Sequence, residues 1–261
     1  MNSPPTRSEA GHFATATVEL SLEGERFEAR LTVPAGPCTP GQLLPSLRPL
    51  AEALLDVTVA RARTEGLSVS CARGCGACCR QLVPISPAEA LEIARLVEDL
   101  PEPRRSVIAA RFVKAREAIA EAGLAPLLLD PESFPDATVQ ALGLDYFRLG
   151  IACPFLEDEA CSIYADRPIS CREYLVSSPA EHCGRPSANT IRTIEPPSKV
   201  WIALARLDED PARRFIPWVP LSLAPEWAAA HPEQPARRTG PELLGLVLEK
   251  LTQKKRKAAS P

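Results

Sequence analysis

The residues of this sequence best suited to chemistry are its nine cysteines. Thiolate is a preferred protein ligand of zinc and of iron-sulfur centres. Four cysteines fall within nine residues, and Gly74 and Gly76 between them let the backbone fold sharply enough for several sulfurs to converge. Eight of the nine are predicted metal ligands, which are Cys71, Cys75, Cys78, Cys79, Cys153, Cys161, Cys171 and Cys183.

The spacing within the first group carries further information. Cysteines that only fill a core would stand among apolar residues, whereas these four have small and charged neighbours. Cys78 and Cys79 are adjacent, and successive side chains diverge, so they rarely bind one ion in good geometry. We therefore expect two metals, or one multinuclear centre. Cys38 stands alone in a proline-rich stretch and is interpreted as a free thiol.

Eight thiolates carry more negative charge than two divalent metals offset, so such a site needs nearby cations. Arg73, Arg80, Arg172 and Arg185 each lie within two residues of a predicted ligand. Arginine stays charged and favours the thiolate form of a neighbouring cysteine. Ordinary surface arginines are an equally good interpretation of the same positions.

The bulk composition narrows the classes of function. A chain of 261 residues with 45% hydrophobic residues can build a core without covalent cross-links. A net charge of -3 gives no general attraction to phosphate polyanions, so nucleic acid is not an expected partner. No apolar leader and no run of about 18 apolar residues is visible. These features predict a cytoplasmic protein without a membrane partner, and a protein partner stays open.

Periodicity predicts the elements that position the cysteines. Residues 14–33 alternate with period two around a Glu-Gly-Glu turn, which favours a β-hairpin. Leucines of residues 43–57 share a helical face, and the capping boxes that begin at Ser86 and Thr239 predict helix starts. Another helix is predicted over residues 104–122.

The region between the two cysteine groups has a different character. Residues 124–136 indicate an ordered connection rich in proline and leucine, followed by a short helix into Tyr146. Cys153 and Cys161 begin two short extended arms around an acidic turn, residues 157–159, which is interpreted as solvated. The basic residues Lys254–Lys257 are typical of a solvated tail.

Together these patterns predict an α+β fold that is mainly helical, with a small N-terminal β-hairpin and a cysteine-rich metal core of loops and short strands. The predicted division is a hairpin and helix over residues 1–66, a cysteine-cluster metal-binding domain over 67–190, and a helical extension with a basic tail over 191–261. The helices between the two cysteine groups would bring their loops together.

Four segments carry a resemblance to a known family. They are Cys71-x-x-x-Cys75-x-x-Cys78-Cys79, Cys153-Pro154-Phe155-Leu156, Cys161-Ser162-Ile163-Tyr164 and Arg167-Pro168-Ile169-Ser170-Cys171-Arg172. In this order, over about residues 70–185, they resemble the YkgJ-type CxxCxxCC family of zinc- or iron-chelating proteins. The resemblance implies eight metal-associated cysteines at the positions given above. Some relatives of this pattern are flagellin lysine methylases, but none of their longer architecture is visible here.

Two other classes of protein share part of this cysteine spacing. The Cys71-x3-Cys75-x2-Cys78 arrangement also occurs in radical-SAM enzymes, where three cysteines hold an iron-sulfur cluster. Ala77 stands where that superfamily has an aromatic residue, and the chain lacks the strand-helix repeat of a barrel. A thiol oxidoreductase would set the Cys75-x-x-Cys78 pair within a βαβ unit, and none is predicted.

The predicted function is metal binding, to zinc, iron or an iron-sulfur cluster, in a structural or electron-transfer role. The alternative is a metal- or iron-sulfur-dependent enzyme that modifies protein side chains, as a lysine methylase does. The sequence leaves open whether the protein is an enzyme. His182 could replace its neighbour Cys183 as a ligand, although a lone exposed histidine is the more common interpretation.

Overall fold

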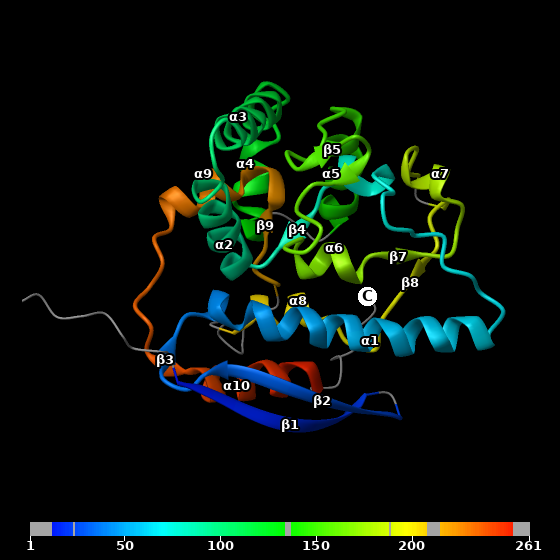
Figure 1. The fold of residues 1–261 in the computed structure, drawn as a ribbon. Coiled ribbons are helices and arrows are strands. Elements are labelled where there is room, and N and C mark those ends of the chain that lie inside the picture. Colours follow the sequence, from blue (N-terminus) through cyan, green and yellow to red (C-terminus); the bar gives the residue numbers. More distant parts are fainter. Residues whose placement is uncertain (1–11, 23, 134–136, 188, 208–214, 253–261) are drawn as a thin grey trace, which may run out of the picture.

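The fold is mainly helical, with short pairs of antiparallel strands, and confirms the predicted α+β class. The computed structural model describes residues 12–22, 24–133, 137–187, 189–207 and 215–252. Figure 1 shows an N-terminal hairpin below a long helix, a group of helices at the upper left, and short elements that carry the cysteines at the upper right. The predicted basic tail, Lys254–Lys257, lies outside the described residues.

The hairpin forms where the alternating pattern predicts it. Strand β1 (Phe13–Leu22) pairs with β2 (Glu25–Pro34), with Leu22 opposite Glu25. The connection uses Gly24, whose φ of 91° is readily adopted only by glycine. One face of the hairpin is apolar and buried, through Leu20, Leu22, Phe27, Leu31 and Val33.

This face packs against two helices, α1 (Leu44–Thr64) and α10 (Gly240–Thr252), to make the first apolar core. A 3-10 turn, η1 (Pro40–Leu43), leads into α1, and β3 (Pro37–Cys38) pairs with β10 (Arg238–Thr239) just before α10. The predicted leucine face of α1 is buried, as are Leu243, Val247 and Leu251. Each such side chain stabilises the fold by about 1.5–3 kcal/mol.

A second apolar core lies at the upper left of Figure 1. It joins α2 (Pro87–Glu98) and α3 (Arg104–Glu121) with α9 (Ala224–Ala230) and the 3-10 turn η4 (Leu221–Leu223). Strand β4 (Pro84–Ile85) pairs here with β9 (Val219–Pro220). The face that the helical period predicts for α3 is the buried one, through Ile108, Phe112, Ala115 and Ile119.

The proline- and leucine-rich connection is partly helical, which its composition did not indicate. It contains α4 (Ala125–Leu129) and the 3-10 turn η3 (Pro131–Ser133), while residues 134–136 are not described. A proline in the first turn of α4 suits a helix start, because its missing N–H would have no partner there. Helix α5 (Ala137–Arg148) follows, and its Tyr146 packs in a third core with Leu128.

The cysteines lie on or beside short elements. These are η2 (Ala77–Arg80), β5 (Leu156–Glu157), β6 (Ala160–Cys161), α6 (Ile169–Glu173), β7 (Leu175–Val176) and α7 (Ala180–Cys183). The predicted acidic turn is the tight connection between β5 and β6, with Asp158 and Glu159 at φ of 49° and 56°. Strand β8 (Thr193–Ile194) pairs with β7, and α8 (Val200–Ala205) returns to the first core.

None of the described helices is long and apolar enough to cross a bilayer. The first core combines the hairpin and α1 with α8 and α10. The three predicted domain ranges, 1–66, 67–190 and 191–261, stay a prediction.

Candidate metal centre

The eight predicted ligands lie together in the folded chain. A negative charge on Cys78 raises the pKa of six other cysteines, which are Cys71, Cys79, Cys153, Cys161, Cys171 and Cys183. Cys75 raises the pKa of Cys71 and of Cys183 in the same way. Such interactions fade over about 10 Å, so both sequence segments contribute to one group of thiols. We call these eight residues the cysteine cluster.

The same interactions divide the cysteine cluster into two quartets. Cys71 and Cys183 interact with each other and with both Cys75 and Cys78, and we call these four the first quartet. The second quartet is Cys79, Cys153, Cys161 and Cys171. Cys78 also interacts with every member of the second quartet. Its place in the first quartet follows instead from the expectation that adjacent side chains serve different metals.

Backbone contacts support this division. The amide of Cys153 donates to the carbonyl oxygen of Cys79 at 2.7 Å, which joins the two segments within the second quartet. In the first quartet, the amide of Val176 donates to the Cys71 sulfur at 3.4 Å. Helix α7, which ends at Cys183, contacts η2, and the Gln81 side-chain amide donates to the Cys183 carbonyl at 3.1 Å.

Two glycines shape the first segment for different reasons. Gly74 has a φ of 88°, a conformation that side chains with a Cβ rarely adopt. Gly76 is required by a close approach, because a Cβ there would lie 2.5 Å from the Glu159 carbonyl oxygen. The turn between β5 and β6 thus packs directly on the loop before η2. Arg80 fixes this contact through two bonds to the Glu159 carboxylate, at 2.6 and 3.0 Å.

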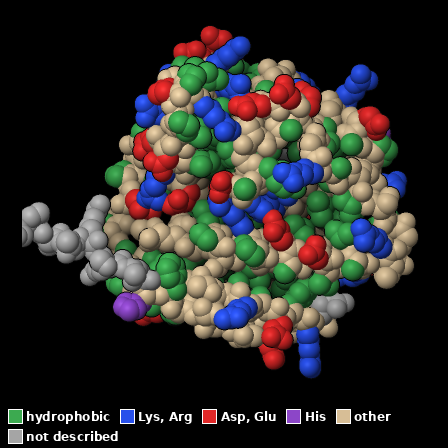
Figure 2. Space-filling model, in the orientation of Figure 1, with side chains coloured by type: hydrophobic (Ala, Val, Ile, Leu, Met, Phe, Trp, Pro, Cys, Tyr) green, Lys and Arg blue, Asp and Glu red, His purple; other side chains and the backbone are tan. Residues whose placement is uncertain are grey.

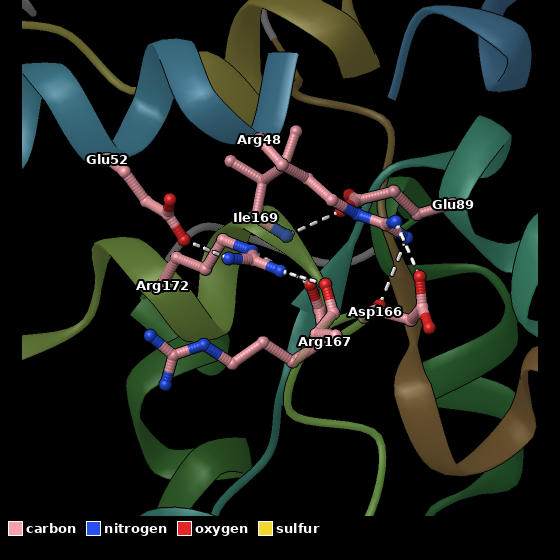
Figure 3. Close-up of polar contacts among 8 residues, drawn as sticks. Arg48, Glu52, Glu89, Asp166, Arg167, Ile169 and Arg172 are labelled. Atoms are coloured by element: carbon pink, nitrogen blue, oxygen red, sulfur yellow. Dashed lines mark hydrogen bonds and ion pairs between the residues drawn. The ribbon is translucent and has the colours of Figure 1, made fainter. Parts of the chain in front are cut away.

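Figure 3 shows how a polar network holds the segment that leads into α6 and Cys171. The buried carboxylate of Glu89 accepts from the Ile169 amide at 2.7 Å and from the Ser86 amide and hydroxyl at 3.0 and 2.8 Å. Arg48 of α1 donates to the side chain and the carbonyl of Asp166, at 2.9 and 3.1 Å. The capping box that begins α2 therefore also fixes the start of α6.

The guanidinium of Arg172 completes this network. It is 5% exposed and donates to the carbonyl oxygens of Ala165 and Arg167, while also pairing with Glu52 of α1. Its burial lowers its pKa, which the nearby Glu52 charge partly opposes. Polar contacts, buried or partly buried, thus join α1, α2 and α6.

Comparison with known families gives this region an assignment. Residues 70–190 match the CxxCxxCC family model, described as "Putative zinc- or iron-chelating domain". We call these matched residues the CxxCxxCC domain, after the model. The match confirms the family resemblance predicted from the four cysteine-bearing segments. No curated protein and no solved structure matched the chain.

Within the CxxCxxCC domain, the thiols have unequal acidities. A hydrogen bond with the Cys79 thiol lowers the pKa of Cys78. The same bond raises the pKa of Cys79. Burial raises the pKa of Cys153 to about 12 and that of Cys183 to about 11. Forming several thiolates here without a compensating cation is unfavourable.

One such cation is a residue that sequence reasoning missed. Arg167 lowers the pKa of Cys71, Cys78 and Cys161. Its guanidinium lies 4.2 Å from the centre of the Tyr164 ring, and that of Arg73 lies 5.0 Å from the same ring. In Figure 3 the Arg167 side chain points away from the network that its carbonyl oxygen joins.

Arg167 lies before α6, separated from it by Pro168, and the thiols whose pKa it lowers lie on other segments. No local spacing in the sequence signals this role. Of the four arginines proposed from the sequence, Arg172 lowers the pKa of Cys161, although its own hydrogen bonds go to backbone and to Glu52. Arg80 pairs with Glu159, and Arg185 is exposed.

The structure also places the two residues whose roles the sequence left open. Cys38 is buried in the first core on β3, and burial raises its pKa. In Figure 1, β3 lies at the opposite side of the molecule from α7. The His182 ring is half-buried, and its Nδ1 contacts the Thr190 carbonyl oxygen at 2.9 Å.

The donor chemistry of the CxxCxxCC domain fits zinc or iron, because soft thiolates select these metals. Within the described part of the chain, no group of three or more His, Cys, Asp or Glu side chains stands close enough together to hold an ion. Binding would therefore require the cysteine side chains to move toward one another from the positions described.

Proposed function

We propose that the cysteine cluster binds zinc or iron, as two neighbouring centres or one multinuclear centre, and that this metal has a structural or electron-transfer role. The observation that carries the proposal is that six other cysteines, from two distant segments, lie close enough for a charge on Cys78 to raise their pKa. The family assignment of residues 70–190 supports chelation of one of these metals. The first quartet would supply one centre and the second quartet the other.

The residues around the thiols support this function. Arg167 places positive charge beside members of both quartets, which favours the thiolate form that a metal needs. The polar network holds α6, and with it Cys171, against α1 and α2. Bound zinc would cross-link these loops, and a bound iron-sulfur cluster would instead supply a one-electron acceptor.

The test is metal analysis, with an absorption spectrum, of protein purified without oxygen. We expect at least one metal ion per chain. A brown chromophore would identify iron-sulfur, and a colourless metal-bound protein would identify zinc. Protein that holds no metal after gentle purification, and takes up none on reconstitution, would refute the proposal.

If the two quartets hold separate metals, single cysteine variants should differ in which metal ion they lose. Cys75→Ser removes a ligand from the first quartet, and Cys161→Ser removes one from the second; in neither variant is the shared residue Cys78 changed. With two separate centres, each variant should lose one metal ion and keep the other, since a hydroxyl substitutes poorly for a soft thiolate. One multinuclear centre would instead lose all of its metal in both variants.

The proposed partners are metal ions, and a protein partner stays open. The proposed location is the cytoplasm, where the reducing environment keeps thiols free to bind metal. On the face drawn in Figure 2, acidic and basic side chains are interspersed. This mixture does not favour a polyanion such as nucleic acid, whose affinity comes mainly from clustered basic residues.

A second candidate function is metal-dependent modification of protein side chains, as in a lysine methylase. The observation that favours it is a cavity beside the cysteine cluster, bordered by Cys78 and Cys171. Structural sites hold their metal with four protein ligands, whereas catalytic sites keep one position open. X-ray absorption spectroscopy of the metal-loaded protein distinguishes them, because four sulfur ligands for every metal would exclude the catalytic arrangement.

A further inference from the structure

The cysteine cluster reaches the surface at one edge of the molecule. Cys75 is exposed there, whereas the other seven predicted ligands are partly or fully covered. Two stretches with many exposed residues, 63–75 and 179–193, form this edge. The Ser70 amide donates to the Val176 carbonyl oxygen at 2.9 Å, and α7 contacts η2. In Figure 1 the end of α1, the loop after it and α7 lie along the right-hand side. We call the surface of these two stretches the cysteine edge.

The cysteine edge carries positive charge that the protein itself does not neutralise. Its exposed arginines without an ion-pair partner among the described residues are Arg63, Arg73, Arg185 and Arg192. Elsewhere, exposed arginines such as Arg105 and Arg148 pair with acidic side chains of their own segment. Two acidic residues are exposed on the edge, Glu181 and Glu65, and the second pairs with Arg61. Positive charge is therefore in excess here, although the whole chain has a net charge of -3.

The composition of the cysteine edge is that of a protein-binding surface. Leu67 lies on it with 41% of its surface exposed, one of few large apolar side chains so exposed in the described part of the chain. Protein interfaces combine apolar contacts with a polar rim, and arginine is enriched in them while lysine is depleted. All the basic side chains of these two stretches other than His182 are arginines. The excess positive charge favours an acidic partner.

The position of this surface beside exposed Cys75 indicates what kind of acidic partner fits. Iron bound by the cysteine cluster would lie close to the surface at this edge, within reach of a docked redox protein. Electron-transfer complexes are weak and bury little area, so they depend on attraction between opposite charges more than on a large apolar interface. A few unpaired arginines around one exposed ligand meet that need.

We propose that the cysteine edge docks a small acidic electron-carrier protein, which passes one electron to an iron-sulfur centre held by the cysteine cluster. The proposal rests on the electron-transfer form of the proposed function. The carrier loses one electron, and one iron of the centre changes from the ferric to the ferrous state. No covalent bond forms or breaks in this step.

The test uses the iron-loaded full chain and, as the probe, a reduced plant-type ferredoxin, which is an acidic one-electron carrier with an iron-sulfur cluster. Rapid mixing under anaerobic conditions, followed by absorption, gives the second-order rate constant of electron transfer. We expect this rate constant to fall about tenfold as salt rises from about 50 to about 500 mM, because salt screens the attraction between the two proteins.

Charge-reversed variants test the location. Arg63→Glu with Arg192→Glu changes two arginines of the cysteine edge that lie more than two residues from every predicted ligand, so the iron content should stay the same. The rate constant at low salt should fall about tenfold. Arg30→Glu with Arg237→Glu is the control, because it gives the same net charge from exposed arginines of β2 and of the segment before β10. This control should slow the transfer far less.

The outcomes separate the two proposals. Equal slowing in both double variants, or a centre that dithionite reduces and ferredoxin does not, would overturn docking at the cysteine edge and leave the proposed function intact. Protein that binds only zinc, or whose iron dithionite does not reduce, would overturn the electron-transfer function and the docking proposal with it.

Discussion

The first core and the cysteine cluster hold their residues in place by different means. Around α1, leucines at helical spacing and alternating residues of the hairpin are buried against one another. Around the cysteine cluster, the chain makes short turns, and the contacts are hydrogen bonds, a glycine close approach and ion pairs. A periodic sequence can build the first kind of region by itself, whereas the second depends on a few specific contacts and, we propose, on metal.

The largest effect should come from the adjacent cysteines. Because adjacent side chains diverge, we expect Cys78 and Cys79 to serve different centres, so neither can replace the other. Serine at either position should then remove at least one metal ion per chain. Metal analysis of the two variants measures this. Cys38→Ala is the control, with alanine chosen because the thiol is buried in an apolar core, and it should keep its full metal content. An unaffected Cys78 or Cys79 variant would remove that residue from the ligand set, and a depleted Cys38 variant would show that the eight ligands are wrongly chosen.

A substitution in the first core should lower the stability of the fold without changing the metal content. Leu47 is fully buried, so Leu47→Ala should lower the free energy of unfolding by about 3 kcal/mol through the cavity it leaves. Denaturant unfolding of the metal-loaded variant measures the loss. Its metal content should stay that of the unchanged protein. A folded Leu47→Ala variant that had lost metal would show that the two regions are not independent.

Two capping boxes of the same pattern give a matched pair. Glu89 is buried and bonds to α6, whereas Glu242 is exposed and bonds to Thr239 at the start of its own helix. Glu89→Gln should lower the free energy of unfolding by about 2 kcal/mol, because one oxygen that accepts a buried hydrogen bond is replaced by a donor. Glu242→Gln should cost clearly less. Equal losses in denaturant unfolding would mean that the bond to Ile169 contributes nothing to the fold.

The smallest effect expected is at the glycine contact. Gly76→Ala places a Cβ against the Glu159 backbone and should cost about 1 kcal/mol or more. Gly143→Ala is the control, since nothing lies within 4 Å of a Cβ there and alanine favours its helix. Thermal unfolding compares them. A Gly76→Ala protein as stable as Gly143→Ala would remove the close approach from the account of the cysteine region.

The comparison also explains which features could be predicted from the sequence. Periodicity predicts the buried face of α3 and the register of the hairpin. Each apolar side chain favours a buried position regardless of which distant residues cover it. The capping box at Ser86 predicted the start of α2, but not the bond from Glu89 to Ile169, eighty residues further along the chain. The family resemblance predicts the eight cysteines, and that set stays a prediction. Their division into quartets depends on how distant loops fold together.

Hydrogen exchange, followed by mass spectrometry, tests the central claim most directly, that the cysteine cluster binds metal which holds this region together. The metal-loaded protein is compared with the same protein after chelation. We predict that chelation increases exchange in the segments around residues 71–80, 153–161 and 169–183, and leaves the hairpin and α1 protected, because the first core does not need metal. Metal loss that left exchange in these segments unchanged, or that exposed the hairpin and α1 instead, would contradict the account.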